Sequence, residues 1–216
     1  MRKLNPRTPP RPLVVAWDAR YRRDRHQCRW DTGRPSPQLV AALRSGVAKP
    51  GVALDIGCGS GTNALYLARR GFAVTAVDAS RLALTQARAK ARAAVVLSTR
   101  IPHPGQVRFH WADATDLWDL PVADFVFDRL CFHLIEPADR KYYLDGLLRH
   151  TRPGSVYLML AIAAPERNPD DPPFTVAATR RLFRRHFRIA ALERIRLDPP
   201  DNRRGYAWVM VRKGSQ

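Results

Sequence analysis

A glycine-rich turn between an apolar run and a helical stretch constrains this 216-residue chain more than any other segment. Residues 53–71 read ALDIGCGSGTNALYLARRG, so the apolar run ends around Asp55 and the chain then passes through three alternating glycines, Gly57, Gly59 and Gly61. Glycine tolerates positive φ and lets a ligand approach the backbone closely. A second apolar run follows the helical stretch, and strand, helix, strand is the βαβ unit of parallel sheets.

The rest of the chain continues this alternation of apolar runs and helical stretches. Four runs have the length of strands, at Val52–Ile56, Phe72–Val77, Val107–Trp111 and Val156–Ile162, and Phe125–Phe127 is predicted to be the buried centre of another strand, the fourth in chain order. Helical stretches lie between several of them, at Asn63–Arg70, Arg81–Ala94 and Pro137–His150. Strands joined by such crossovers run parallel and have both faces covered. The pattern therefore predicts an α/β fold with a doubly wound, mostly parallel sheet and helices on both faces.

The formal net charge of +18, from 37 basic against 19 acidic residues, raises the question of a nucleic-acid partner. The basic residues are nearly all arginines, and they are spread along the chain instead of forming one block. We interpret them as a solvated surface. Specific binding of nucleic acid is therefore not expected.

The cysteines and the hydropathy pattern exclude several other classes. Cys28, Cys58 and Cys131 show no CxxC spacing, so the sequence favours neither a disulfide framework nor a metal site. No apolar run approaches the roughly 20 residues that a membrane-spanning helix needs, so no membrane partner is expected. A reducing, cytoplasmic location fits best, and the oligomeric state stays open.

Acidic residues stand at the ends of three successive predicted strands: Asp55, Asp78 and Asp113. The carboxyl ends of parallel strands meet at one edge of the sheet, which is where open α/β folds bind ligands. At the end of the second strand, a carboxylate can accept both hydroxyl groups of a ribose. The glycines are spaced GxGxG instead of GxGxxG, which disfavours a site for a dinucleotide pyrophosphate.

This order of the glycine motif at 55–61, then Asp78, then Asp113 resembles the class I S-adenosylmethionine-dependent methyltransferases, whose motif I reads DxGxGxG. The resemblance implies a Rossmann-like fold with S-adenosyl-L-methionine as cofactor. It also implies that Asp55 or the glycine backbone holds the amino-acid end of the cofactor, and that Asp113 and Ala114 contact its adenine. The residues expected to bind the cofactor are Trp30, Asp55, Gly57, Cys58, Gly59, Gly61, Asp78, Ala79, Asp113, Ala114 and Arg129.

Two further segments resemble the small-molecule methyltransferases that act on thiopurines, thiols and halides. Residues 29–37, RWDTGRPSP, look like the W-D-x-G-x-x-x-P entry segment of that group, and residues 127–133, FDRLCFH, look like its DRGCFH stretch. Leu130 replaces the usual glycine, which leaves the local turn open. The resemblance implies that Trp30 packs over the cationic sulfonium, which an aromatic face attracts. A simple core tryptophan is the alternative.

The same resemblance implies how the ends of the chain are organised. It adds an antiparallel C-terminal hairpin to the edge of the five-stranded sheet, giving about seven strands. The candidate hairpin strands are Ile189–Leu197 and Tyr206–Val211, after a helix that Thr175 caps. The expected organisation is a disordered basic arm (1–13) and one methyltransferase domain (14–214), with a helical cap (14–48), a cofactor-binding core (51–162), and a lid loop and hairpin (163–212).

His133 is the first candidate for a catalytic role, as a general base or a group that orients the acceptor. Histidine titrates near neutrality, and His133 follows the fourth strand, where these methyltransferases present their acceptors. Asp128 is the second candidate, because it could fix the tautomer of His133. As alternatives, His133 bonds a backbone carbonyl, and Asp128 forms a structural ion pair with Arg129.

The predicted function is in-line transfer of a methyl group from S-adenosyl-L-methionine to the sulfur or oxygen of a small molecule. A thiol-like acceptor is favoured slightly, because a thiol of pKa near about 8.5 is partly ionised at neutral pH and needs little help from a base. One alternative is an RNA or other nucleic-acid methyltransferase, with Cys131 as a nucleophile, although no preceding proline supports it. The other is a protein that binds the cofactor without transferring its methyl group.

Overall fold

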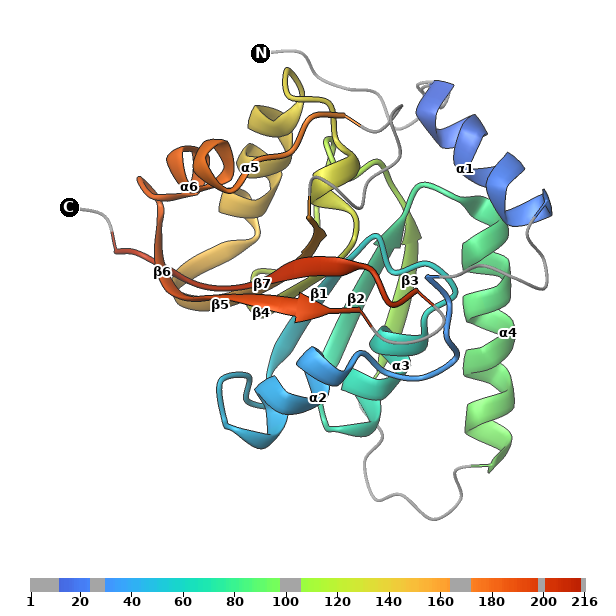
Figure 1. The fold of residues 1–216 in the computed structure, drawn as a ribbon. Helices are drawn as coiled ribbons and strands as arrows, with labels where there is room; N and C mark the ends of the chain where they lie inside the picture. The colour runs from blue at the N-terminus through green and yellow to red at the C-terminus, as the bar shows by residue number, and fades with distance from the viewer. Residues whose placement is uncertain (1–11, 24–29, 98–105, 164–171, 198–200, 215–216) are drawn as a thin grey trace.

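The computed structural model describes residues 12–23, 30–97, 106–163, 172–197 and 201–214. The described residues form a seven-stranded sheet (Figure 1). Its strands, in order across the sheet, are β3 (Val107–Trp111), β2 (Ala73–Asp78), β1 (Val52–Ile56), β4 (Ala123–Arg129), β5 (Thr151–Ile162), β7 (Arg204–Arg212) and β6 (Phe187–Arg196). The strands from β3 to β5 run parallel, whereas β7 is antiparallel to β5, and β6 to β7. The predicted mixed sheet with a C-terminal hairpin is confirmed.

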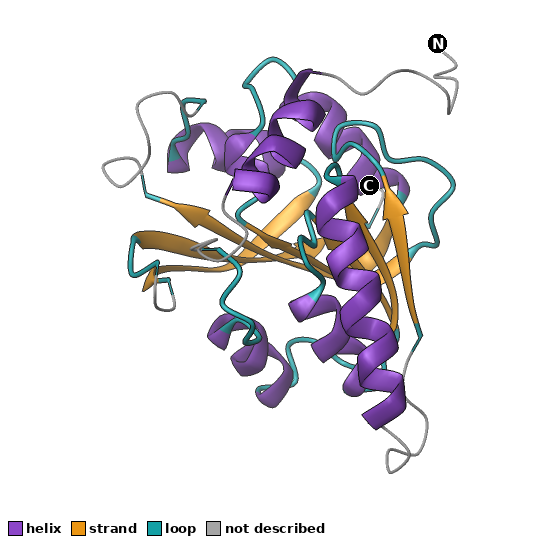
Figure 2. Cartoon of the chain, turned by 90° about the vertical axis from the view of Figure 1, so that its right-hand side faces the viewer, coloured by secondary structure: helices purple, strands orange, loops and turns teal. Residues whose placement is uncertain are grey.

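Helices cover both faces of the sheet (Figure 2). They are α1 (Pro12–Arg23), α2 (Pro37–Arg44), α3 (Thr62–Arg69), α4 (Arg81–Leu97), the 3-10 helix η1 (Phe132–Leu134), α5 (Arg140–Arg149) and α6 (Val176–Phe183). The apolar residues of α2 and α3 belong to one buried cluster, and those of α5 and α6 belong to a second. Burial on both faces is why the central strands are nearly continuous apolar runs.

Several boundaries differ from the sequence prediction. The helix α5 begins at Arg140 instead of Pro137, because the preceding residues close turns in which the Asp139 amide donates to the Glu136 carbonyl at 2.9 Å. The first helix begins at Pro12, inside the expected arm, since proline at a first turn loses no intrahelical hydrogen bond. Thr175 caps α6 as predicted, accepting a hydrogen bond from the Ala178 amide at 3.1 Å.

Parts of the expected arm, lid loop and hairpin turn, at residues 1–11, 164–171 and 198–200, lie outside the described residues. Within the described ranges, none of the helices combines the length and apolar character required to pass through a lipid bilayer.

Candidate cofactor and acceptor site

A cavity opens at the carboxyl ends of the parallel strands. It lies where the strand order changes direction, between β1 and β4, which is the usual place for a ligand in an open α/β sheet. Most of the predicted site residues line it: Trp30, Gly57, Cys58, Gly59, Asp78, Ala79, Asp113, Ala114, Arg129 and His133. Asp55, Gly61 and Asp128 are not among the described residues that line it.

The glycine loop leaves no room for side chains at its first two glycines. Gly57 has φ +71° and Gly59 has φ +56°, in the left-handed region that favours glycine. A Cβ atom on Gly57 would stand 2.7 Å from the Cβ of Cys131, and one on Gly59 would stand 2.8 Å from the hydroxyl of Tyr21. The backbone of the loop therefore packs directly against Cys131 and Tyr21, and both glycines line the cavity. By contrast, a Cβ atom on Gly61 would meet Ala87 and Phe109 in the core, so its role is packing.

Asp78 joins the glycine loop to the end of β2. Its Oδ2 atom accepts a hydrogen bond from the Gly59 amide at 2.8 Å, and its Oδ1 atom accepts one from the Ser80 amide at 2.8 Å. Burial raises the pKa of Asp78 to about 6, although these amides lower it in part. The carboxylate keeps lone pairs for a ligand, since each oxygen can accept more than one hydrogen bond.

Asp55 lies beneath the loop instead of facing the cavity. Among the described residues, its buried Oδ2 atom has no hydrogen-bond partner. Burial, and then the nearby charges of Asp128 and Asp78, raise the pKa of Asp55 to about 8, while a hydrogen bond from the Ala64 amide lowers it in part. Asp55 therefore lies under the loop, at the start of α3, and its direct contact with the cofactor stays a prediction.

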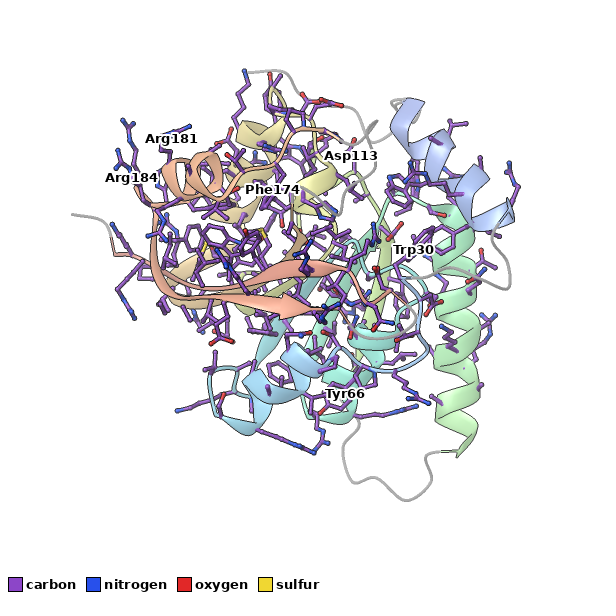
Figure 3. All side chains as sticks on the ribbon, in the orientation of Figure 1. Trp30, Tyr66, Asp113, Phe174, Arg181 and Arg184 are labelled. Atoms are coloured by element: carbon purple, nitrogen blue, oxygen red, sulfur yellow. The ribbon has the colours of Figure 1, made fainter. Side chains whose placement is uncertain are left out.

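Asp113 follows β3 and lines the cavity (Figure 3). Its Oδ1 atom accepts hydrogen bonds from the amide and the hydroxyl of Thr115, at 2.8 and 2.7 Å. Nearby, the Trp111 indole donates to the Ala79 carbonyl at 2.6 Å and so ties the ends of β3 and β2 together. The part of the site that is expected to hold the adenine thus lies at the ends of β2 and β3, which this hydrogen bond links.

Asp128 lies under the turn that follows β4 and is fully buried. Its carboxylate accepts hydrogen bonds from the amides of Cys131 at 2.8 Å and Phe132 at 3.0 Å, and from the Tyr143 hydroxyl at 2.7 Å. Burial raises the pKa of Asp128 to about 7. The catalytic role expected of Asp128 does not fit this position, because its oxygens face the backbone of the turn and not the cavity. We assign it the support of that turn.

Leu130 stands in the same turn with φ +70°, where the resembling motif has glycine. A left-handed backbone costs a non-glycine residue about 1–2 kcal/mol. The hydrogen bonds to Asp128 on the following amides hold the turn in spite of that cost. The turn therefore has the left-handed conformation typical of glycine, although leucine stands at this position.

His133 and Cys131 reach the cavity from this turn. The ring of His133 is buried and stands edge-on to Phe174, with ring centroids 6.3 Å apart. Burial and the neighbouring carboxylates raise the pKa of the Cys131 thiol well above its usual range, and the same causes raise that of Cys58. Neutral thiols are weak nucleophiles, so the reading of Cys131 as a nucleophile loses support. In the described part of the chain, no cluster of His, Cys, Asp and Glu is suited to a metal ion.

Trp30 lies next to α1 (Figure 3) in a group of aromatic rings. Its indole donates to the Tyr21 hydroxyl at 3.2 Å, and the rings of Trp17 and Tyr21 each stand edge-on to it at 6.0 Å. All three rings line the cavity. The sequence reasoning missed Trp17 and Tyr21, whose spacing of four residues places both on one face of a helix.

Polar contacts attach the entry segment to the core. The Arg129 guanidinium donates to the Trp30 carbonyl at 2.7 Å. Asp31 accepts a hydrogen bond from the Ser60 hydroxyl in the glycine loop and pairs with Lys90 of α4 at 3.4 Å. Trp30 is therefore fixed from both sides, over the loop and beside the end of β4.

Comparison with known proteins identifies the family. The family model described as Thiopurine S-methyltransferase (TPMT) matches residues 15–213. The chain is 28% identical over 142 residues to 2-heptyl-1-hydroxyquinolin-4(1H)-one methyltransferase of Mycobacteroides abscessus, covering 65% of this chain and 59% of that protein. It is 28% identical over 151 residues to thiopurine S-methyltransferase of Equus caballus, covering 64% and 62%. The matches span about three fifths of the length of these relatives.

Solved structures share the fold over nearly the whole chain. One, from work on the conversion of a disulfide bond into a thioacetal group during echinomycin biosynthesis, has a TM-score of 0.77 and 28% identity, and the match covers 94% of each chain. Another, Burkholderia thailandensis 1,6-didemethyltoxoflavin-N1-methyltransferase with bound 1,6-didemethyltoxoflavin and S-adenosylhomocysteine, has a TM-score of 0.68 and 22% identity, covering 94% and 88%. The chain belongs to the thiopurine S-methyltransferase (TPMT) family of class I S-adenosylmethionine-dependent methyltransferases.

Proposed function

We propose that this protein transfers the methyl group of S-adenosyl-L-methionine to a sulfur or oxygen atom of a small molecule, with a thiol-like acceptor favoured. The observation that carries the proposal is one cavity that contains both a cofactor half and an acceptor half. We assign the cofactor half to the part over β1, β2 and β3, and the acceptor half to the part beyond β4 with Cys131 and His133. Arg129, expected to bind the cofactor, ends β4, where the two halves meet.

The cofactor half fits S-adenosyl-L-methionine. Asp78 ends β2, where a carboxylate can accept the two ribose hydroxyls, and we assign the adenine to Asp113 and Ala114, which line the cavity after β3. The bare backbone of Gly57 and Gly59 suits the amino-acid end of the cofactor. When bound, the cofactor supplies a methyl group on a cationic sulfonium. The aromatic rings around Trp30 are suited to that cation.

Charges of both signs line the cavity. Asp78 ends β2, Asp113 follows β3, and Asp31 lies in the entry segment. Among the basic residues of the lining, Arg129 ends β4 and Arg203 directly precedes β7, beside the end of β5, while Arg20 and Arg34 come from α1 and the entry segment. Arg203 keeps an ion pair with the buried Asp201. Guanidinium groups favour the ionised form of a nearby acid. This supports an acceptor that reacts as an anion, such as a thiolate or an oxyanion.

The protein's own contribution would be alignment and exclusion of water. Holding the two reactants in line can supply roughly 7–11 kcal/mol of the barrier reduction. The aromatic group of Trp17, Tyr21 and Trp30 lines one side of the cavity, and His133 lines it beyond β4, with the core residue Phe174 packed edge-on against its ring. His133 would take the acceptor proton where the acceptor is a phenol or an alcohol.

Cofactor affinity is expected to fall in acid solution. The pKa of Asp78, raised to about 6 by burial, means that the carboxyl is protonated below pH 6 and ionised above it. If the ionised form accepts the ribose hydroxyls, affinity for S-adenosylhomocysteine should be constant above about pH 7 and fall up to about tenfold per unit below pH 6. Calorimetry between pH 5 and 8 measures this. The variant Asp78→Asn should show no such slope, and a flat wild-type profile would contradict the assignment.

The proposed reaction is tested with labelled cofactor and three classes of acceptor: a small thiol, a hydroxylated aromatic compound and RNA. We expect label in the thiol or the hydroxyl compound and none in RNA. RNA should bind only weakly and with a steep salt dependence, as a non-specific polyanion does. Label in RNA would reverse the proposal. If the cofactor binds and no acceptor of any class is labelled, a role without methyl transfer gains support.

A further inference from the structure

Asp18 of α1 makes a contact that the cofactor site does not by itself require. Its Oδ1 atom accepts hydrogen bonds from the Ser80 hydroxyl at 2.6 Å and from the Leu82 amide at 3.1 Å. The Ser80 hydroxyl in turn accepts a hydrogen bond from the Ala83 amide at 3.0 Å. A residue from a helix more than sixty positions earlier thus caps the start of α4.

The cap supplies a carboxylate and hydrogen-bond acceptors, and the first turn of α4 has no acidic residue of its own. The first turn of α4, RLAL, contains no acidic residue, although the start of a helix favours negative charge and acceptors for its free amides. Asp18 and Ser80 together satisfy the amides of Leu82 and Ala83. The carboxylate on α1 is therefore matched to the start of α4, which gives α1 a defined docking position.

That docking position decides where two aromatic rings of the cavity lie. Trp17 directly precedes Asp18 in α1, and Tyr21 follows three residues later; both line the cavity. The Tyr21 hydroxyl lies so close to Gly59 that a Cβ atom there would be 2.8 Å away, and it also holds the indole of Trp30. A shift of α1 would move these rings off the glycine loop.

Hydrogen bonds of Ser80 also link Asp18 to Asp78. The Ser80 amide donates to Asp78 Oδ1 at 2.8 Å while the Ser80 hydroxyl donates to Asp18. Asp78 Oδ2 accepts from the Gly59 amide. A continuous set of hydrogen bonds thus runs from α1 through Ser80 and Asp78 to the glycine loop.

We propose that Asp18 is a positioning residue for the cofactor site, which fixes α1 and its aromatic rings over the cofactor half of the cavity. The inference rests on the proposed function, because it concerns the same site. Asp18 acts through the start of α4 and through Trp17 and Tyr21, and it does not touch the reacting atoms. Its removal should loosen both the cofactor and the helix above it.

The test compares Asp18→Ala and Asp18→Asn with Arg22→Ala, a control at an exposed position of the same helix outside the cavity lining. Calorimetry gives the affinity for S-adenosylhomocysteine at a temperature where every variant is folded, and hydrogen exchange reports on residues 12–23. Asp18→Ala should bind about tenfold more weakly. It should also lose protection in α1, because the contact that holds α1 to the start of α4 is gone. Asp18→Asn should stay within about threefold of wild type, since asparagine caps about as well as aspartate. Arg22→Ala should change neither the affinity for S-adenosylhomocysteine nor the exchange protection of α1.

A second variant, Ser80→Ala, removes the shared hydroxyl and keeps the amide that Asp78 needs. It should weaken binding as Asp18→Ala does, and the effect of the double variant should be smaller than the sum of the two, because both changes break the Ser80–Asp18 hydrogen bond. The inference fails if Asp18→Ala binds like wild type, if α1 keeps its protection, or if the two effects add fully. If Asp18→Ala does not fold, Ser80→Ala alone decides. Both readings are independent of turnover, so an absence of methyl transfer would overturn the proposed function and not this inference.

Discussion

Replacing Asp78 with alanine is expected to weaken the binding of S-adenosylhomocysteine by about 10- to 150-fold, the equivalent of about 1.5–3 kcal/mol for a charged hydrogen-bonding group. Two losses combine in this variant. The ribose hydroxyls lose their acceptor, and the amides of Gly59 and Ser80 lose the oxygens that hold the glycine loop to the end of β2. Isothermal titration calorimetry at pH 7.5 measures the change, because the carboxyl is ionised there.

Asp124 offers a matched control for this variant. It also accepts a hydrogen bond from a backbone amide, that of Val52 at 3.0 Å, but it is not among the described residues that line the cavity. Asp124→Ala should lower thermal stability and leave cofactor affinity unchanged. Unchanged affinity in Asp78→Ala would remove the ribose assignment.

Replacing His133 with alanine is expected to separate two classes of acceptor. For a phenol or an alcohol, turnover should fall by about 10² to 10⁴, and the acidic limb of the pH–rate profile that belongs to His133 should vanish, as on loss of a general base. For a thiol, activity should fall modestly and recover as the pH rises through the thiol pKa, because the thiolate then forms without help. A pH–rate series on wild type and variant distinguishes the two.

Burial of His133 makes a second variant necessary. The side chain is fully buried in η1, so alanine would also leave a hole beside Phe174. His133→Asn keeps most of the volume and removes the base, and it should reproduce the loss of turnover with less loss of stability. If both variants keep full activity over the whole pH range on the true substrate, His133 is structural.

The sequence predicted the sheet well because its signals were local. Apolar runs mark buried strands, and the alternating glycines of residues 57–61 mark the turn that leads into α3. Helix starts were predicted less well. Pro137 suggested the first turn of a helix, yet the residues after it close separate turns and α5 begins only at Arg140. Several turn types share the same residues, so tertiary packing decides among them.

The site was harder to predict, because an acid after a strand can face in either of two directions. Asp78 and Asp113 point into the cavity, whereas Asp55 and Asp128 point under the adjoining turns and are held by backbone amides. The sequence does not distinguish these cases, since both kinds of acid follow a buried strand. Trp17 and its neighbours on α1 were missed for a different reason. Their role depends on where α1 docks, and that contact spans more than sixty residues of sequence.

Among the described residues, β6 forms one edge of the sheet, which has a consequence for the protein at high concentration. An unpaired edge strand can recruit the same strand of another molecule and begin aggregation. Along β6, Arg188, Arg194 and Arg196 are exposed, and the pairing with β7 is irregular between Ile189 and Ala191. Exposed charged side chains on a strand that is not flat disfavour edge-to-edge pairing of two copies, and Glu193 adds a fourth charge to the three arginines. The arginines of this edge thus give part of the large positive charge a colloidal role, because they make growth of the sheet into another molecule less favourable.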